Sequence, residues 1–233
     1  MSALKVVRRS DSVMSPQIRA RRICPPRHVT VGRLPLLPNK VLEVICIHPL
    51  RITAYNKRVT TYVLAGGCFW CLDAVYRRLK GVTKVITGYS GGYVVDPRYH
   101  QVALGATGHA ETVKVRFNEK IIPKNVILDI FFLIHDPTSL NKQGPDIGAQ
   151  YRSAIFYADK YQEKDFTDAI QRAKSHWGNN IVTEVSLLDE FYPAETEHQD
   201  YFNKNPDNGY CPIVIAPKIN KARAAYTQWF KEE

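Results

Sequence analysis

The densest group of potentially reactive side chains lies at residues 66–71, where the sequence reads Gly-Gly-Cys-Phe-Trp-Cys. A short apolar run, Tyr62–Ala65, precedes the glycines and a helical pattern follows them, which predicts a strand, a tight turn and a helix that begins near Cys68. Free N–H groups and the helix dipole stabilise a thiolate at such a position. The sequence therefore predicts a lowered pKa and a nucleophilic role for the Cys68 thiol.

The pair formed by Cys68 and the second cysteine of this motif, Cys71, is compatible with three kinds of site. A zinc site needs two further ligands, and neither Cys211 nor the histidines supply a second closely spaced pair, so we expect no metal. A thioredoxin-like dithiol usually has small residues or proline between its cysteines, whereas Phe69 and Trp70 stand here. Alternatively, Cys68 attacks a substrate, becomes oxidised and is then resolved by another cysteine.

Other polar residues are expected where loops meet strands or helices. Glu111 follows Gly-His-Ala at the start of a predicted strand, and the loop 143–153 carries Asp146 and Tyr151. Tyr99 lies in a loop after a glycine pair. Each has an ordinary structural explanation by itself, but together with Cys68 they supply a nucleophile, a proton donor and hydrogen-bonding phenols.

The elements that would position these groups alternate between strands and helices from residue 61 onward. We expect strands at 62–65, 82–89, 112–117 and 153–157, with helices at 72–79 and from Pro123 to 134 between them. A polar helix to about residue 177, a strand at 182–188, a helix after Pro193 and a last helix at roughly 218–230 follow. This order predicts an α+β fold, a two-layer α/β sandwich with a mixed sheet of split βαβ (ferredoxin-like) type and C-terminal helical and coil additions.

Residues 1–60 differ from the rest and hold the whole net charge of +10. They contain 12 Lys and Arg against two acidic residues, whereas 61–233 contain 20 of each. We expect 61–233 to be the catalytic domain. The first 60 residues are interpreted as a disordered basic arm, a transit peptide or the product of a start codon assigned too far upstream.

Composition and charge also limit where the protein acts and what it binds. The neutral body argues against nucleic-acid binding, and no apolar run approaches the ~18 residues of a membrane span. An odd number of cysteines, five, with no clear signal peptide favours a reducing compartment, with the cytoplasm as the expected location and an organelle if 1–60 is a transit peptide.

From residue 61 onward, the sequence resembles the peptide methionine sulfoxide reductase A family, which reduces the S epimer of methionine sulfoxide. The resemblance covers roughly three quarters of the chain and rests on several motifs in the family's order: 67–70 (GCFW), 88–92 (GYSGG), 108–111 (GHAE), 135–138 (HDPT), 143–153, 198–201 (HQDY), 205–206 (NP) and 209–212 (GYCP).

The resemblance implies a role for each candidate residue. Cys68 would attack the sulfoxide sulfur, between pocket walls formed by Phe69 and Trp70. Glu111 would protonate the sulfoxide oxygen, a task that needs a raised pKa. The same oxygen would accept hydrogen bonds from the phenols Tyr99 and Tyr151, and Asp146 would lie in the polar part of the site.

The resemblance also implies how the enzyme is recycled. Many family members have glycine at the position of Cys71 and resolve with a cysteine near the C-terminus; this chain has both Cys71 and Cys211. We expect both to act, with their order open, and thioredoxin to reduce the resulting disulfide without a bound cofactor. A monomer is expected. The alternative function is a general thiol–disulfide oxidoreductase that uses Cys68 and Cys71.

Overall fold

The computed structural model describes residues 59–232, so the predicted extension 1–60 lies almost wholly outside the described residues. Its centre is a six-stranded sheet in the order β7-β6-β1-β3-β2-β8. Every neighbouring pair is antiparallel except β6 and β7, so the sheet is mixed. The strands are β1 (Val59–Gly66), β2 (Val82–Ser90), β3 (Ala110–Asn118), β6 (Ser153–Tyr157), β7 (Glu184–Leu187) and β8 (Phe191–Pro193).

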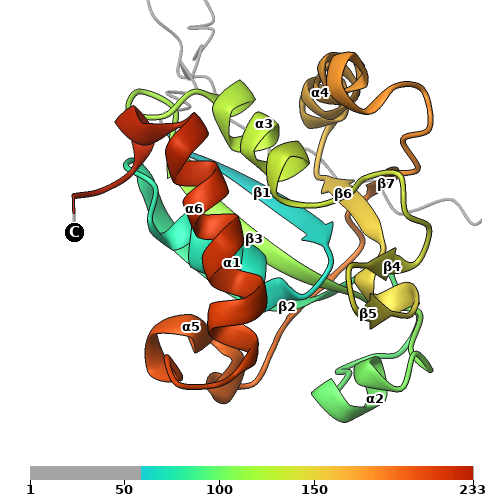
Figure 1. Cartoon of the computed structure of the whole chain (residues 1–233). Coiled ribbons are helices and arrows are strands. Elements are labelled where there is room, and N and C mark those ends of the chain that lie inside the picture. The colour runs from blue at the N-terminus through green and yellow to red at the C-terminus, as the bar shows by residue number, and fades with distance from the viewer. Residues whose placement is uncertain (1–58, 233) are drawn as a thin grey trace, which may run out of the picture. The chain divides into compact units, whose positions relative to one another are not determined.

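Two helices that connect these strands pack on one face of the sheet, as Figure 1 shows. Helix α1 (Phe69–Arg77) joins β1 to β2, and α3 (Lys124–Ile134) joins β3 to the hairpin region before β6. Seven of the eleven residues of α3 are buried, since the helix packs against α4 (Lys160–Trp177) and α6 (Ala216–Ala225). By contrast, α4 buries only Phe166 and Ala169, as expected for its polar sequence.

The first two thirds of the predicted elements match the structure. The four predicted strands lie within β1, β2, β3 and β6, and the predicted helices correspond to α1, α3 and α4. Pro123 stands directly before α3, where its missing N–H costs no helical hydrogen bond. Strand β1 begins at Val59, so a domain cut at residue 61 would lose the pairs Val59–Asn118 and Thr60–Phe117.

Strand β7 lies within the predicted strand 182–188, and after it the structure departs from the prediction. The expected helix after Pro193 is wrong: 191–193 form β8 against β2, and only a 3-10 turn (Thr196–His198) and the short helix α5 (Tyr201–Lys204) follow. A left-handed backbone at Asp200 (φ 57°) prevents one continuous helix. The last helix, α6, ends at Ala225, because Tyr226 leaves the helical region; a π-helical turn, Cys211–Ile215, precedes it.

Four further small elements were not predicted. Tyr99, expected in a loop, is the first residue of α2 (Tyr99–Ala103). The loop 143–153 contains a two-stranded ribbon of β4 (Lys142–Gln143) and β5 (Asp146–Ile147), followed by a 3-10 turn, Ala149–Tyr151. Within residues 59–232, no helix has the length and apolar character needed to cross a bilayer.

Candidate active site

Cys68 stands at the N-terminal cap of α1, directly after the turn that leaves β1. Gly67 makes this turn in a left-handed conformation, with φ 87°. A Cβ atom at this position would approach Cγ of Gln143 to 2.4 Å, so the turn requires glycine for space as well as for conformation. The predicted strand, turn and helix around Cys68 are therefore confirmed.

Glu111 lies beside this cap although it belongs to a different strand. Its side chain is 1% exposed, and its Oε2 accepts a hydrogen bond of 3.0 Å from the backbone N–H of Phe69. Burial raises the pKa of Glu111 to about 8, and the negative charge of Asp146 acts in the same direction. The carboxyl is thus mainly protonated at neutral pH, as a proton donor must be.

The pKa values of the two cysteines in the motif shift in opposite directions, and that of Cys68 differs from the prediction. Burial raises the pKa of the Cys68 thiol, and its hydrogen bond to Cys71 and the charge of Glu111 raise it further. The same hydrogen bond, with Lys218 and Tyr210, lowers the pKa of Cys71 to about 7 despite its burial. The lowered pKa predicted for Cys68 is therefore wrong, because the helix end cannot offset desolvation and the neighbouring carboxyl.

The two predicted phenols lie in the same electrostatic environment. Tyr99 and Tyr151 are half-buried, and the charges of Cys68, Glu111 and Asp146 act on both. Burial raises the pKa of Tyr99 to about 12 and that of Tyr151 further above its ordinary value. Both hydroxyls therefore stay protonated and can donate hydrogen bonds at any physiological pH.

Aromatic rings enclose the other side of the site. Trp70 is stacked on Tyr201, with ring centres 3.6 Å apart and planes inclined by 7°. The ring of His198 lies 5.6 Å from Phe69 and 4.1 Å from Tyr99. Among the described residues, Trp70 Nε1 and His198 Nδ1 are buried without a hydrogen-bond partner. The wall is thus apolar but holds two polar atoms without partners.

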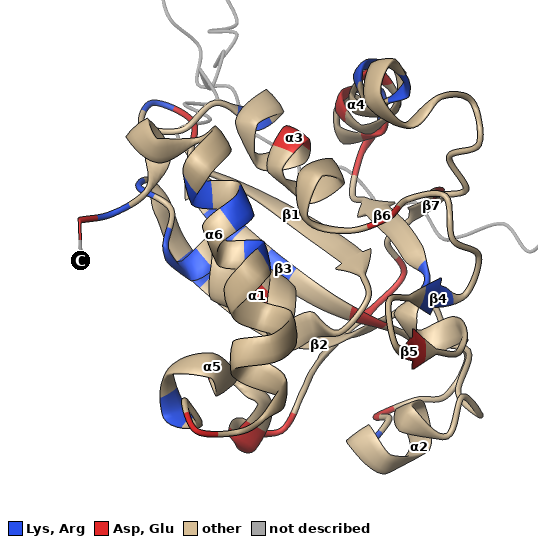
Figure 2. Ribbon diagram, in the orientation of Figure 1, with Lys and Arg blue, Asp and Glu red and all other residues tan. Residues whose placement is uncertain are grey.

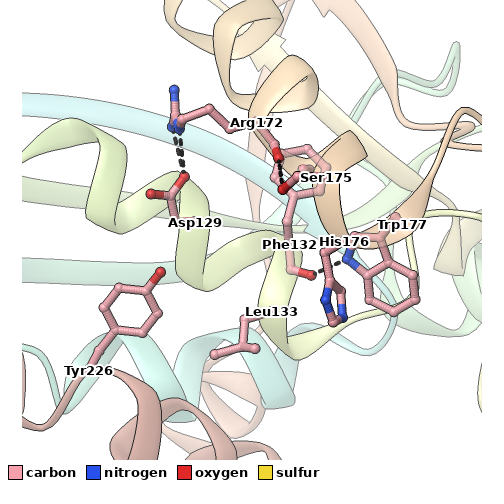
Figure 3. Close-up of a pocket in the computed structure, with 9 residues that line it drawn as sticks. Asp129, Phe132, Leu133, Arg172, Ser175, His176, Trp177 and Tyr226 are labelled. Carbon is pink, nitrogen blue, oxygen red and sulfur yellow. Dashed lines mark hydrogen bonds and ion pairs between the residues drawn. The ribbon is translucent and has the colours of Figure 1, made fainter.

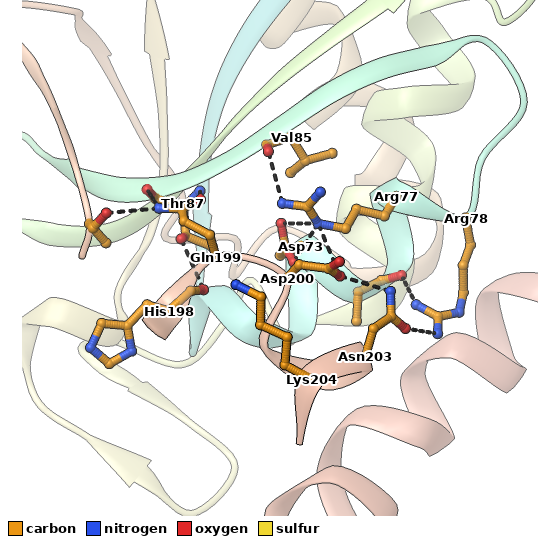
Figure 4. A network of polar contacts seen from close by, with 12 residues as sticks. Asp73, Arg77, Arg78, Val85, Thr87, His198, Gln199, Asp200, Asn203 and Lys204 are labelled. Atoms are coloured by element: carbon orange, nitrogen blue, oxygen red, sulfur yellow. Dashed lines mark hydrogen bonds and ion pairs between the residues drawn. The ribbon is translucent and has the colours of Figure 1, made fainter. Parts of the chain in front are cut away.

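A polar network behind this wall connects α1 to the segment that carries Tyr201 (Figure 4). The guanidinium of Arg77 contacts the buried carboxylate of Asp73 at 2.8 Å and that of Asp200 at 3.5 Å. The side chain of Gln199 bonds to both backbone groups of Thr87. These contacts fix the strained turn at Asp200, directly before the tyrosine that stacks on Trp70.

The structure thus brings together all the residues predicted for the site, and three more that received no predicted role. Tyr210 donates a hydrogen bond of 2.7 Å to Asp146 and lies edge-on to Trp70, 6.0 Å between ring centres. His198 and Tyr201 complete the aromatic wall. The only sequence signal for these three was their presence in the motifs 198–201 and 209–212.

Cys211 lies in the hydrophobic core that also includes Cys68 and Cys71. It is fully buried in the π-helical turn, and its pKa is raised by burial and by the charge of Cys71. All three thiols of the described region are free. No group of three or more His, Cys, Asp or Glu side chains suited to a metal ion occurs within 59–232.

A separate cavity of about 310 Å³ opens between α3, α4 and Tyr226 (Figure 3). Trp177 lines it and donates a hydrogen bond to the carbonyl of Phe132, while Arg172 is paired with Asp129. None of the predicted site residues lines this cavity, so it does not belong to the thiol site.

Comparison with known proteins places this geometry in a family. A sequence model of the family "Peptide methionine sulfoxide reductase" matches residues 60–230. A peptide methionine sulfoxide reductase MsrA of Paenarthrobacter aurescens is 54% identical over 72% of this chain and 97% of its own length. One from Clavibacter michiganensis is 56% identical over 73% of this chain and 98% of its own.

Solved structures agree with the sequence comparison. Mxr1 from Saccharomyces cerevisiae in reduced form has a TM-score of 0.62 and 36% identity, over 66% of this chain and 90% of its own. Methionine sulfoxide reductase A of Corynebacterium diphtheriae has a TM-score of 0.61 and 31% identity, over 68% of this chain and 80% of its own.

The matches define the chain as an enzyme of the oxidoreductase class. The chain belongs to the peptide methionine sulfoxide reductase A family, as the sequence motifs predicted.

Proposed function

We propose that this enzyme reduces the S epimer of methionine sulfoxide, free and in oxidised proteins, and so repairs oxidative damage. In the first step Cys68 attacks the sulfoxide sulfur while Glu111 protonates the oxygen. The oxygen passes to Cys68 together with the proton from Glu111, so Cys68 is oxidised to a sulfenic acid and the sulfoxide is reduced to the thioether; the thiol proton of Cys68 replaces the proton that Glu111 gave up. Phe69 and Trp70 would hold the methyl group, and Tyr99 and Tyr151 would donate hydrogen bonds to the oxygen.

The observation that carries this proposal is the buried, protonated Glu111 at the turn of Cys68. Burial keeps its proton available at neutral pH, and the Phe69 N–H orients the carboxyl. A dithiol that only exchanges disulfides needs no such acid, nor two protonated phenols around it. These groups favour oxygen transfer over the alternative of a general thiol–disulfide oxidoreductase.

Recycling would then need only thiols. A second cysteine, Cys71 or Cys211, displaces the sulfenic oxygen as water and forms a disulfide, which thioredoxin would reduce. Cys68 caps α1 and Cys71 lies in its first turn, and the turn Cys211–Ile215 packs against the same helix, which supports short paths between the thiols. No bound cofactor enters this scheme, because the electrons come from the thiols.

The test is turnover of separate S and R epimers of a methionine sulfoxide peptide by the full chain, with thioredoxin and, in parallel, a small dithiol. S-selective turnover that disappears in Cys68→Ser supports the proposal. Equal reduction of both epimers, or turnover by the Cys68→Ser variant, contradicts it.

Four finer expectations remain proposals. The ferredoxin-like description of the core is supported by the order β6-β1-β3-β2, with α1 and α3 as the two connecting helices. A domain of about 61–233 is supported by the family match over 60–230 and should be tested from residue 59, where β1 begins. A monomer and a cytoplasmic location can be checked by light scattering and by fractionation of cells.

A further inference from the structure

The coil between β8 and α5 carries two acidic residues that differ in their surroundings. Figure 2 shows acidic positions in red along the coil that leads into α5, and Glu195 and Glu197 belong to this coil. Glu197 is exposed, whereas Glu195 is half-buried. The carbonyl of Glu195 also accepts a hydrogen bond of 3.0 Å from the backbone N–H of His198. Glu195 is therefore directly attached to the segment that supplies the aromatic wall.

Both oxygens of the Glu195 carboxylate accept hydrogen bonds from other elements. Oε1 accepts a bond of 2.9 Å from the backbone N–H of Tyr99, the first residue of α2. Oε2 accepts a bond of 2.9 Å from the hydroxyl of Tyr89, a fully buried residue of β2. The carboxylate thus connects the start of α2 to the central sheet.

Helix α2 depends on such contacts for its position. It has five residues, whereas an isolated helix needs about 12 to be even marginally stable in water. Its fourth residue, Val102, is buried, and the carbonyl of its last residue, Ala103, accepts a hydrogen bond of 2.9 Å from Gln150. Glu195 holds the opposite end of the helix, at Tyr99.

The same connection reaches the part of the sheet that carries Glu111. Tyr89 stands directly opposite Glu111 in the register of β2 and β3, so the two side chains lie on the same face. The ring of Tyr89 lies 5.9 Å from that of Phe69, whose backbone N–H bonds to Glu111. Glu195 therefore links Tyr99 to the pair of strands that positions the acid.

We propose that Glu195 is a positioning residue of the oxygen-transfer step: its carboxylate fixes the start of α2 on Tyr89 and so holds the hydroxyl of Tyr99 where it can bond to the sulfoxide oxygen. This inference rests on the proposed function, in which Tyr99 donates a hydrogen bond to that oxygen. The rings of His198 and Phe69, at 4.1 and 6.4 Å, restrain the ring of Tyr99 from its sides. The hydrogen bond from the Tyr99 backbone adds a directional contact that sets how far its hydroxyl reaches.

The experiment is a double-mutant cycle between Glu195→Met and Tyr99→Phe in the full chain. The matched control is Glu197→Met, which removes the same charge from an exposed residue of the same coil. Each reduced protein is mixed with the S-sulfoxide of a methionine peptide, and methionine release in the first turnover is followed by rapid quench. A series of sulfoxide concentrations separates the rate of the chemical step from the affinity for the sulfoxide.

We expect Tyr99→Phe to slow the chemical step by up to about tenfold, the contribution of one hydrogen bond, with little change in affinity. Glu195→Met should slow it by a similar factor in the unmodified chain, but by less than about twofold in the Tyr99→Phe chain, because the hydroxyl that Glu195 positions is then already absent. Glu197→Met should have no effect.

Glu195→Gln should restore the rate to within about twofold of the unmodified enzyme. The amide oxygen can accept the hydrogen bond from the Tyr99 N–H, and the amide nitrogen can donate one to the Tyr89 hydroxyl. If circular dichroism shows that Glu195→Met does not fold, Tyr89→Phe takes its place in the cycle. This change detaches the carboxylate from the sheet and should also slow the chemical step only while the Tyr99 hydroxyl is present.

Four outcomes overturn the inference. Equal slowing by Glu195→Met with and without the Tyr99 hydroxyl indicates a merely structural role, as does failure of Glu195→Gln to restore the rate. An unchanged rate in Tyr99→Phe removes the phenol through which Glu195 would act, although reductase activity remains. If the unmodified enzyme releases no methionine, the proposed function itself has failed, and this is seen before any variant is compared.

Discussion

The two parts of the site are held in different ways. Cys68 follows the end of β1 and Glu111 lies near the start of its antiparallel partner β3, and the backbone N–H of Phe69, next to Cys68, donates a hydrogen bond to Glu111. The segment 196–215, which supplies His198 and Tyr201 of the aromatic wall as well as Cys211, has short 3-10, α- and π-helical turns and is held mainly by side chains. The sheet thus fixes the oxygen-transfer chemistry, while side-chain contacts fix the binding wall and the recycling thiol.

The largest effect should come from the sheet-bound half. Glu111→Gln keeps an oxygen acceptor for the Phe69 N–H but removes the proton donor. We expect the first turnover to slow by roughly 10²–10⁴-fold, the range of general acid catalysis, with little change in substrate affinity. Rapid-quench measurement of methionine release checks this; a rate near that of the unmodified enzyme would remove Glu111 from the mechanism.

The same residue predicts the pH dependence of the first turnover. Because burial raises the pKa of Glu111 to about 8, the active protonated form predominates below that pH and is lost above it. The rate should therefore fall about tenfold per pH unit above pH 9. The remaining activity of Glu111→Gln should lack this decline; a decline that persists there would assign the titration to another group.

In the side-chain-held half, Tyr201→Leu should mainly weaken binding. The change removes the ring stacked on Trp70 but leaves Cys68 and Glu111 in place. We expect KM for the sulfoxide to rise by up to about tenfold, in line with roughly 0.5–1.5 kcal/mol for a lost aromatic contact, with kcat within about threefold. Steady-state kinetics with a small dithiol as reductant give KM and kcat separately. A loss confined to kcat would argue that this wall also orients the reacting atoms.

The smallest effect on activity is expected for Arg77→Met, behind the wall. The change leaves Asp73 buried without its guanidinium partner and should lower the free energy of unfolding by about 2 kcal/mol at pH 7.5. The pKa of Asp73 is already raised to about 6, mainly by burial. In the folded variant the Asp73 carboxyl binds its proton more tightly than in the unfolded chain, so the stability of the variant should fall as pH rises. The loss of unfolding free energy relative to the unmodified enzyme should therefore be smaller at pH 5. Urea denaturation at the two pH values measures both.

The same contrast explains what could be predicted from the sequence. Strands such as 153–157 and the turn at Gly67 follow from apolar runs and glycine, so the positions of Cys68 and Glu111 could be anticipated. The path of 194–215 could not, because it depends on distant partners such as Thr87 for Gln199 and Asp146 for Tyr210. The direction of the Cys68 pKa was mispredicted for the same reason: local sequence shows the helix end but not the burial or the carboxyl beside it.

The stacking of Trp70 gives the enzyme an internal optical probe. Its indole is adjacent in sequence to Cys71 and in ring contact with Tyr201 and Tyr210. Of the other two tryptophans, Trp177 lies in the other cavity, hydrogen-bonded to Phe132, and Trp229 lies in the 3-10 turn Thr227–Trp229 near the C-terminus. Thiolates and disulfides quench indole emission, so ionisation or oxidation of the Cys71 sulfur should alter the fluorescence of Trp70. A single excitation wavelength could then follow oxidation and recycling in real time, without a label or a modified substrate.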